Sequence, residues 1–211
     1  MLDVKNVSFR YNKKIDRYVL KNLSTKFETG FVYVIAGSSG AGKTTLLSLL
    51  AALDYCTEGE ILYNGVDLKK INSDKYRATH IGFVFQQFNL LNNHNAIENV
   101  VIGMEISGVK VDNKTTQAKS VLMGMGITED KHNRKVVELS GGEQQRVAIS
   151  RAIAHNPSII LADEPTGNLD EENQNNIIKI LKKLAYESGK CVIISSHSKD
   201  VINEADCVIN L

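Results

Sequence analysis

The fold of this chain is decided by residues 31–45, which read Phe31-Val32-Tyr33-Val34-Ile35-Ala36-Gly37-Ser38-Ser39-Gly40-Ala41-Gly42-Lys43-Thr44-Thr45. The first six residues are nearly all apolar, as expected of a central strand in a parallel sheet. Residues 37–44 then fit the pattern G-x-x-x-x-G-K-[ST] of a phosphate-binding loop, and residues 44–53 read as a buried helix. Strand, glycine-rich loop and helix in this order are the context that the motif requires. We therefore predict a nucleoside triphosphate site here.

The loop supplies phosphate ligands from its backbone. Gly37, Gly40 and Gly42 let the chain curl until its N–H groups point at phosphate oxygens, and the helix that follows adds its positive N-terminal end. In such a loop Lys43 reaches the β- and γ-phosphates, and the Thr44 hydroxyl is a ligand for Mg²⁺. The residues predicted to bind the nucleotide are Gly37, Ser38, Ser39, Gly40, Ala41, Gly42, Lys43, Thr44 and Thr45.

The composition of the chain bounds its class. Its 211 residues suffice for one domain, with or without a subdomain, and 43% apolar and 23% charged residues are ordinary for a soluble globular protein. The formal net charge of +1 argues against bulk attraction to nucleic acid, so no nucleic-acid partner is expected. No apolar run approaches the ~20 residues needed to cross a bilayer, and the N-terminus lacks the apolar core of a signal peptide. We therefore expect a cytoplasmic protein.

Strands and helices alternate along most of the chain, which indicates an α/β fold with a parallel sheet covered on both faces. Between about 90 and 140 the pattern becomes helical and more polar, so a helical insertion is expected there. Apart from residues 31–36, the expected strands lie at 4–9, 23–27, 59–65, 81–85, 159–163 and 190–195, and a further helix at 171–187.

Two carboxylates end one of these apolar strands. Asp163 and Glu164 directly follow residues 159–162. Beside a phosphate loop, Asp163 would help to hold Mg²⁺, directly or through water. Glu164 would then face the γ-phosphate and polarise the attacking water. By themselves the two carboxylates could equally open a solvated loop, and it is the phosphate loop that favours the catalytic interpretation.

The most selective motif follows much later, at residues 139–146, which read Leu-Ser-Gly-Gly-Glu-Gln-Gln-Arg. Ser140 is a plausible helix N-cap, and Glu143 three residues later completes the capping-box pattern S-x-x-E. The helix is expected to continue to about residue 155 and to stop before Pro157. A capped helix N-terminus with two bare glycines is an anion site.

With the phosphate loop upstream, this L-S-G-G-x-Q signature motif resembles that of the ATP-binding cassette (ABC) ATPases. The resemblance spans residues 4–209 and implies ATP and Mg²⁺ as cofactors. It also implies the fold: an α/β P-loop NTPase with a mostly parallel central sheet, an antiparallel β subdomain and an inserted α-helical subdomain. In this family the signature motif binds nucleotide across a dimer. Ser140, Gly141, Gly142 and Glu143 would therefore contact the nucleotide held by the phosphate loop of a second copy.

The resemblance also implies the domain organisation. We expect a single ABC ATPase domain over residues 1–211. Residues 1–89 and 141–211 would form a RecA-like core with an N-terminal β subdomain, and about 90–140 the helical subdomain.

Other elements of the family pattern fall in order along the chain. Tyr11 stands where the family places an aromatic residue that stacks on adenine, with Phe9 and Tyr18 as rivals. Gln86 matches the glutamine that contacts Mg²⁺ and the lytic water, with Gln87 as its neighbouring candidate.

His197 follows an apolar strand and matches the histidine that grips the γ-phosphate. Residues 168–170 resemble the loop that crosses to the opposite subunit. One departure is Ser38, where many members carry proline, and it costs little because the donors of the loop are backbone groups. The resemblance thus assigns catalysis to Lys43, Gln86, Glu164 and His197, and Mg²⁺ binding to Thr44, Gln86 and Asp163.

Two local strings narrow the resemblance to one branch of the family. Residues 82–91 read GFVFQQFNLL and precede AIENV at 96–100, while residues 163–170 read DEPTGNLD. Both resemble the ABC ATPases of macrolide export, lipoprotein release, antimicrobial-peptide resistance and cell division. Their partners are permeases with large extracytoplasmic domains. This implies an ATP-dependent homodimer, peripheral on the inner face of the cell membrane, that drives an integral membrane permease on a separate chain.

The permease contact is expected in a groove between the Gln86 loop and the helical insertion. Phe88, Asn89, Leu90 and Leu91 would lie near its floor, although these residues could equally belong to ordinary core.

Two alternatives stay open from the sequence. A cell-division ATPase of the same branch, whose permease transports nothing, fits the same motifs. A soluble ABC ATPase acting on DNA or the ribosome is a different class of protein. Relatives of that class carry long coiled coils, zinc modules or two fused cassettes, whereas this chain has no sustained heptads, no C-x-x-C and one cassette.

Overall fold

The computed structural model describes residues 1–11 and 18–211. Five strands form one sheet: β3 (Val32–Ala36), β6 (Ile81–Val84), β7 (Ile159–Asp163), β8 (Cys191–Ser196) and β9 (Cys207–Asn210). Their order is β6-β7-β8-β3-β9, and each pairing is parallel. Strands β3 and β8 are buried over their whole length, as their continuous apolar sequences predict.

A second sheet is built from β1 (Leu2–Phe9), β2 (Leu20–Phe27), β4 (Glu58–Tyr63) and β5 (Val66–Asp67). Its order is β2-β1-β4-β5 and its pairings are antiparallel. Asn64 and Gly65 connect the last two strands with φ values of 49° and 84°. Positive φ at both central residues is the signature of a type I′ turn, which matches the twist of a hairpin.

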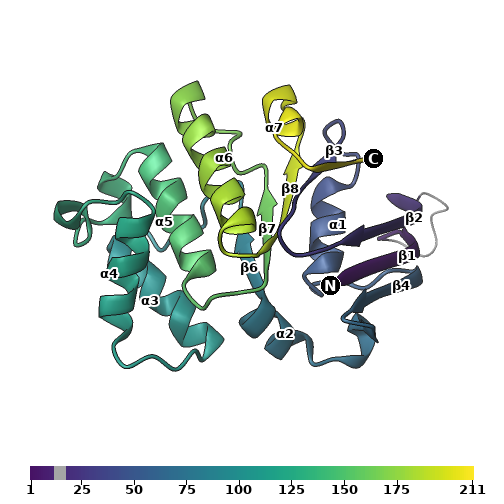
Figure 1. The fold of residues 1–211 in the computed structure, drawn as a ribbon, viewed down its shortest axis with the longest axis horizontal. Coiled ribbons are helices and arrows are strands. Elements are labelled where there is room, and N and C mark those ends of the chain that lie inside the picture. The colour runs from purple at the N-terminus through teal and green to yellow at the C-terminus, as the bar shows by residue number, and fades with distance from the viewer. Residues whose placement is uncertain (12–17) are drawn as a thin grey trace.

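The helices are α1 (Lys43–Leu50), α2 (Ser73–His80), α3 (Ala96–Ser107), α4 (Lys114–Gly124), α5 (Gly141–Ile153), α6 (Glu171–Tyr186) and α7 (Lys199–Asn203). Short 3₁₀ turns lie at Leu68–Lys70, Glu129–Lys131 and Val136–Glu138. In Figure 1, α3, α4 and α5 gather at one end of the molecule and the antiparallel strands at the other, with the parallel sheet between them.

The side chains of the parallel sheet alternate between two cores, because successive residues of a strand face opposite sides. Leu161 and Ile193 belong to an apolar cluster with α1 and the antiparallel sheet. Their neighbours Ile160 and Val192 belong to a second cluster with α6. The parallel sheet is therefore covered on both faces, as the sequence predicts.

Helix α5 connects two parts of the protein. Its Val147 and Ala154, the residue that follows it, pack in a third apolar cluster with α3 and α4, while its Ile149 and Ala152 pack in the cluster that includes α6. The apolar cluster of the helical region thus extends past residue 140, where the sequence interpretation placed its border. The division into a core and a helical subdomain stays a prediction.

The predicted α/β P-loop fold is confirmed, with differences in detail. Helices α2 and α7 were not expected from the sequence. Helix α1 ends at Leu50, before the expected residue 53, because Ala52 adopts a left-handed conformation with φ 51° that no helix can contain. Within residues 1–11 and 18–211, none of the helices has the length and apolar character needed to span a membrane.

Candidate nucleotide-binding site

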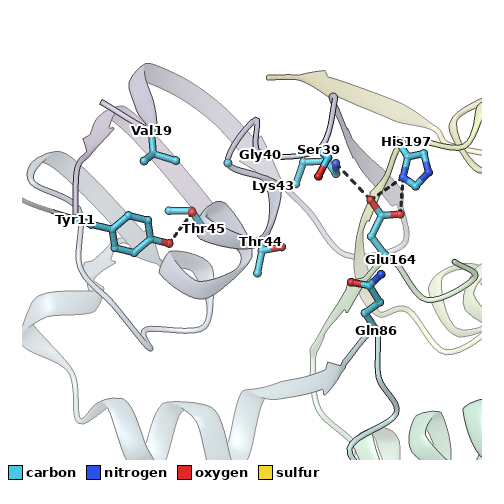
Figure 2. Close-up of a pocket in the computed structure, with 11 residues that line it drawn as sticks. Tyr11, Val19, Ser39, Gly40, Lys43, Thr44, Thr45, Gln86, Glu164 and His197 are labelled. Atoms are coloured by element: carbon cyan, nitrogen blue, oxygen red, sulfur yellow. Dashed lines mark hydrogen bonds and ion pairs between the residues drawn. The ribbon is translucent and has the colours of Figure 1, made fainter. Parts of the chain in front are cut away.

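A pocket of about 420 Å³ opens at the carboxyl ends of the parallel strands (Figure 2). Parallel strands place the residues that follow them at one edge of the sheet, and ligands of open α/β sheets bind there. The phosphate loop follows β3, Gln86 follows β6, Glu164 follows β7 and His197 follows β8. The lining residues are Tyr11, Val19, Ser39, Gly40, Gly42, Lys43, Thr44, Thr45, Gln86, Glu164 and His197.

Lys43 lies at the centre of this nucleotide pocket and is only 7% exposed. Its Nζ donates to the carbonyl oxygens of Gly37 at 2.9 Å and Ser38 at 3.1 Å. The same Nζ lies 3.3 Å from Glu164 Oε1. These contacts hold the Lys43 ammonium over its own loop. When a nucleotide binds, the ammonium can donate to a phosphate oxygen in place of a loop carbonyl and stay in the pocket.

The N-terminus of α1 carries no side-chain cap. Its N-cap is Gly42, with φ 101°, and no acidic residue lies in its first turn. A Cβ at Gly42 would come within 3.0 Å of Val19 and Leu20 side chains, so the position excludes larger residues. The first N–H groups of a helix have no intrahelical acceptor. In α1 these N–H groups can therefore donate to a bound anion.

Asp163 is held by two hydroxyl groups. Thr44 Oγ1 donates to its Oδ1 at 3.1 Å, and Ser195 Oγ donates to the same oxygen at 2.5 Å. The structure therefore brings Thr44 and Asp163 together, as the sequence predicts for a metal site. Ser195 was not anticipated, because its position depends on the parallel pairing that sets Asp163 opposite Ser195 in β7 and β8.

Glu164 adopts an unusual backbone conformation, with φ 44°. Its N–H donates to Ser195 Oγ at 3.0 Å and to the Ser195 carbonyl at 3.1 Å, which holds it in this strained region. Its carboxylate lies 3.0 and 3.1 Å from His197 Nδ1. Because an ionised carboxylate only accepts, His197 Nδ1 is the donor.

The aromatic end of the pocket is formed by Tyr11. Its side chain is 70% exposed, and its hydroxyl lies 2.9 Å from Thr45 Oγ1. Of its rivals, Phe9 is buried and supports the Tyr11 ring edge-on at 4.9 Å. The Tyr18 hydroxyl is directed to Glu58, at 2.6 Å. Tyr11 is thus the candidate with an accessible ring in the pocket, and Val19 is a lining residue that the sequence interpretation did not single out.

Of the two adjacent glutamines, Gln86 lines the pocket and Gln87 does not. The Gln86 carbonyl accepts a 3.4 Å bond from Asn168 Nδ2, so the two predicted loops are in contact. Asp170 caps α6 by accepting from the Asn173 N–H at 2.8 Å. Hydrogen bonds from the backbone and side chain of Asn173 lower the pKa of Asp170.

The signature motif (residues 139–146) is arranged as the predicted capping box. Ser140 Oγ accepts from the Glu143 N–H at 3.3 Å, and Glu143 Oε2 accepts from the Ser140 N–H at 2.9 Å. Burial acts to raise the pKa of Glu143, but hydrogen bonds from Lys131 and Ser140 outweigh it, so that this pKa is lowered. None of residues 140–143 lines the nucleotide pocket. In Figure 1, α5 lies among the helices at one end of the molecule, while α1 lies beyond the parallel strands.

The two glycines of the signature motif have different surroundings. A Cβ at Gly142 would overlap the Asn173 side chain, so this glycine is needed for α5 to pack against α6. A Cβ at Gly141 would meet only Leu169 Cδ2, at an ordinary 3.8 Å. The folded chain has room for a side chain at Gly141. Because glycine has none, this surface is open to a ligand or a second chain.

A second hollow, of about 590 Å³, is mostly apolar and lies beside α2 and α3. Its apolar lining residues are Ala78, Ile81, Phe83, Phe85 and Ile106, and cationic Lys75, Arg77 and Arg151 also line it. We call it the apolar groove.

The predicted permease contact at residues 88–91 stays a prediction, but none of these residues lines the apolar groove. Phe88 and Asn89 have φ values of 50° and 49°, and their carbonyls accept from Arg151 at 2.9 and 2.5 Å. Leu90 packs instead against the cluster of the helical region. The Leu91 N–H donates to Asn99 Oδ1 at 2.8 Å. These residues support the groove through Arg151 rather than lining it.

A glycine-rich loop folded over a buried lysine at the edge of a parallel sheet, with a carboxylate pair at the end of another strand of that sheet, defines a P-loop nucleotide-binding protein. Residues 20–167 match the family model described as ABC transporter. The chain belongs to this family, and it is an ABC ATPase subunit.

Relatives in two transport systems resemble the chain over its whole length. The lipoprotein-releasing system ATP-binding protein LolD of Syntrophus aciditrophicus is 41% identical, with 100% of this chain and 96% of the relative covered. The macrolide export ATP-binding/permease protein MacB of Pasteurella multocida is 36% identical, with 100% of this chain but 33% of that longer relative covered.

Solved structures show the same cassette. The dimeric structure of MJ0796, a bacterial ABC transporter cassette, has a TM-score of 0.89 and 38% identity, covering 100% of this chain and 94% of that chain. The same cassette is also known as a dimer in a post-hydrolysis state bound to ADP and Pi, with a TM-score of 0.89 and 37% identity. The predicted ATPase class is confirmed by these comparisons.

Proposed function

We propose that this chain works as a homodimer that encloses two ATP molecules and, by closing and reopening, drives an integral membrane permease on another chain. The observation that carries this proposal is the separation of the signature motif from the nucleotide pocket of the same chain. Two anion sites that cannot share one phosphate within a monomer can share it between two copies arranged head to tail.

Gly141 supports this arrangement. Neither its backbone conformation nor its packing requires glycine. Glycine as the first residue of the helix does allow a phosphate from another molecule to come close to the helix N-terminus. Ser140, Gly141, Gly142 and Glu143 would then complete the pocket of the second copy, with residues 168–170 beside the contact.

Within its own pocket, each chain would hold ATP by the phosphate loop (residues 37–44), Thr45 and the ring of Tyr11. Thr44 is hydrogen-bonded to Asp163 and lines the same pocket as Gln86, and hydroxyl, carboxylate and amide oxygens are the ligand chemistry that Mg²⁺ prefers. When bound there, Mg²⁺ would neutralise charge on the β- and γ-phosphates.

Hydrolysis would depend on the four predicted catalytic residues around the γ-phosphate, Lys43, Gln86, Glu164 and His197. Lys43 would stabilise the charge that develops on it. Glu164, with its carboxylate fixed by His197, would orient and polarise the attacking water. Gln86, at the end of β6, would report the state of the nucleotide to the loop that follows it.

The apolar groove would be the contact with the permease. Ile106, at 76% exposure, is the most exposed of the large apolar residues in the described part of the chain, and it lines this groove. LolD and MacB are named for lipoprotein release and macrolide export, which favours a permease with an extracytoplasmic domain. The protein would then be peripheral on the inner face of the cell membrane.

The test is purification of tagged Glu164→Gln protein from its own cells, in detergent and with ATP, followed by mass spectrometry. We expect an ATP-dependent dimer together with an integral membrane protein that has a large outer domain. Recovery of only ribosomal, DNA-bound or other soluble partners would overturn the permease assignment. The sequence of the recovered permease separates a transport role from a cell-division role.

The groove is tested by a matched pair of variants in the same experiment. Ile106→Glu should lose the permease and keep ATP binding. Met123→Glu is the control, because Met123 is 55% exposed on α4 and lies outside the groove. Equal loss of the permease in both variants would contradict the assignment of the apolar groove as the permease contact.

A further inference from the structure

A negative charge lies next to the anion site of the signature motif. Glu143 is in the first turn of α5, the same turn whose N–H groups would receive a phosphate. Its carboxylate is 15% exposed in the single chain. Glutamate is favourable there for the helix itself, because it complements the positive N-terminal end. For the same reason it competes with an arriving phosphate.

The competition grows as the dimer closes. Like charges repel more strongly as the effective dielectric constant around them falls. Contact with a second copy would remove water from this surface and lower the dielectric constant at the site. An uncompensated Glu143 would therefore oppose dimer closure.

Lys131 compensates this charge. Its Nζ lies 2.5 Å from Glu143 Oε1, while Oε2 accepts from the Ser140 N–H at 2.9 Å. Each carboxylate oxygen thus has a donor. The lysine side chain is 31% exposed, so part of its surface is already removed from water.

The loop that carries Lys131 is built to direct this ammonium to Glu143. The adjacent carboxylate, Asp130, is occupied by Arg134 at 3.0 Å and by the Thr128 hydroxyl at 2.6 Å. The Lys131 N–H donates to the Thr128 carbonyl at 2.9 Å and closes the turn. Asp130 therefore has hydrogen-bond and ion-pair partners of its own, while the close contact of the lysine is with Glu143.

We propose that Lys131 is a positioning residue of this ATPase, which neutralises Glu143 so that the signature glycines can receive the γ-phosphate of ATP held by a second copy. This inference rests on the proposed ATP-enclosing dimer. Lys131 touches neither substrate nor the reacting atoms, and it acts through Glu143.

The test is a double-mutant cycle in the Glu164→Gln background, with Lys131→Met, Glu143→Gln, the two combined, and neither. Glutamine at this position keeps the capping box and removes the charge. The dissociation constant of the ATP-bound dimer is measured by analytical ultracentrifugation. ATP affinity is measured separately below the dimerisation concentration.

We expect Lys131→Met alone to raise the dissociation constant of the ATP-bound dimer about tenfold. When Glu143→Gln is also present, Lys131→Met should change this dissociation constant by less than about twofold, because no charge is left to neutralise. ATP affinity of the monomer should be equal in all four proteins. Lys131→Arg should retain the dimer. With Glu164 intact, Lys131→Met should raise KM for ATP hydrolysis more than it lowers kcat.

Equal weakening by Lys131→Met in both backgrounds would show a packing role and overturn the inference, as would the absence of any weakening. If Lys131→Met simply unfolded the loop, the combined variant would fail as well, which is the same contrary result. If the Glu164→Gln protein without further changes binds ATP but never dimerises, the proposed dimer itself is overturned, and this inference with it.

Discussion

Helices α1 and α5 both begin beside glycines, at N-termini that we propose receive a phosphate, but the two N-termini are capped differently. Helix α1 begins at Gly42 with no side-chain cap and no acid in its first turn. Helix α5 begins with Ser140 and Glu143 in a complete capping box. Among the residues that the structure describes, no side chain accepts a hydrogen bond from the N-terminus of α1, whereas in α5 the Ser140 hydroxyl already accepts from the Glu143 N–H. The difference suits a site that holds nucleotide firmly and a second site that meets it only transiently.

The largest expected effect separates chemistry from binding at the first site. Glu164→Gln should lower kcat for ATP hydrolysis by ~10²–10⁴-fold, the range that a positioned acid or base contributes. Nucleotide binding should survive, because the phosphate loop is untouched. Phosphate release measures the first and equilibrium binding of ATP the second. Glu187→Gln, on the exposed end of α6, is the control, and near-normal turnover in Glu164→Gln would remove this residue from its role.

Lys43→Ala should show the opposite pattern. Loss of hydrogen bonds to a charged group costs ~1.5–3 kcal/mol, so the Kd for ATP should rise by ~10–100-fold. Calorimetric titration with ATP measures this directly. An unchanged Kd would mean that the loop backbone alone supplies the affinity and that the two helix N-termini differ less than their caps indicate.

At the N-terminus of α5, the two glycines of the signature motif separate an effect on folding from an effect on dimerisation. Gly142→Ala should lower the free energy of unfolding by ~1–3 kcal/mol through overpacking against Asn173, a side chain already held by Asp170. Gly141→Ala should leave thermal unfolding unchanged and weaken ATP-dependent dimerisation. Calorimetry and ultracentrifugation of the pair measure both effects. A stable dimer in Gly141→Ala would contradict the assignment of this surface to a second copy.

The smallest effect is expected from the cap itself. Ser140→Ala removes one side-chain acceptor and should cost ~1 kcal/mol of stability, which lowers Tm by ~2–4 °C in a protein of this size. Thermal unfolding without nucleotide measures it. Ser198→Ala is a suitable control, because Ser198 precedes α7 without making a side-chain cap. A drop of the same size in both variants would show that capping at α5 is not special.

Much of this organisation was predictable from local sequence. The strand, loop and helix around Lys43, the strand that ends at Asp163, and the capping box of Ser140 each lie within a few consecutive residues, so short patterns reveal them. The α/β fold followed from the same alternation. The sequence already favoured Tyr11 and Gln86 and left Phe9, Tyr18 and Gln87 as rivals. That Tyr11 and Gln86 line the pocket and their rivals do not is visible only in the structure, because it depends on where the backbone directs each side chain.

The residues that were missed depend on distant pairing. Ser195 reaches Asp163 only because β7 and β8 pair in a particular register. Lys131 reaches Glu143 across a loop with no regular periodicity. Phe88 and Asn89 contact the apolar groove through Arg151 and do not line it, and their consecutive left-handed conformations have no strong signal in non-glycine residues.

Helix α5 has one further consequence. Its first residue, Gly141, lies where we propose the contact with a second copy. Its Arg151, near the other end, donates to the carbonyls of Phe88 and Asn89 and lines the apolar groove. Thirteen residues of helix extend over ~20 Å. If both proposals hold, a single helix of this length joins the phosphate contact to the permease contact, so that a movement of one end moves the other with it.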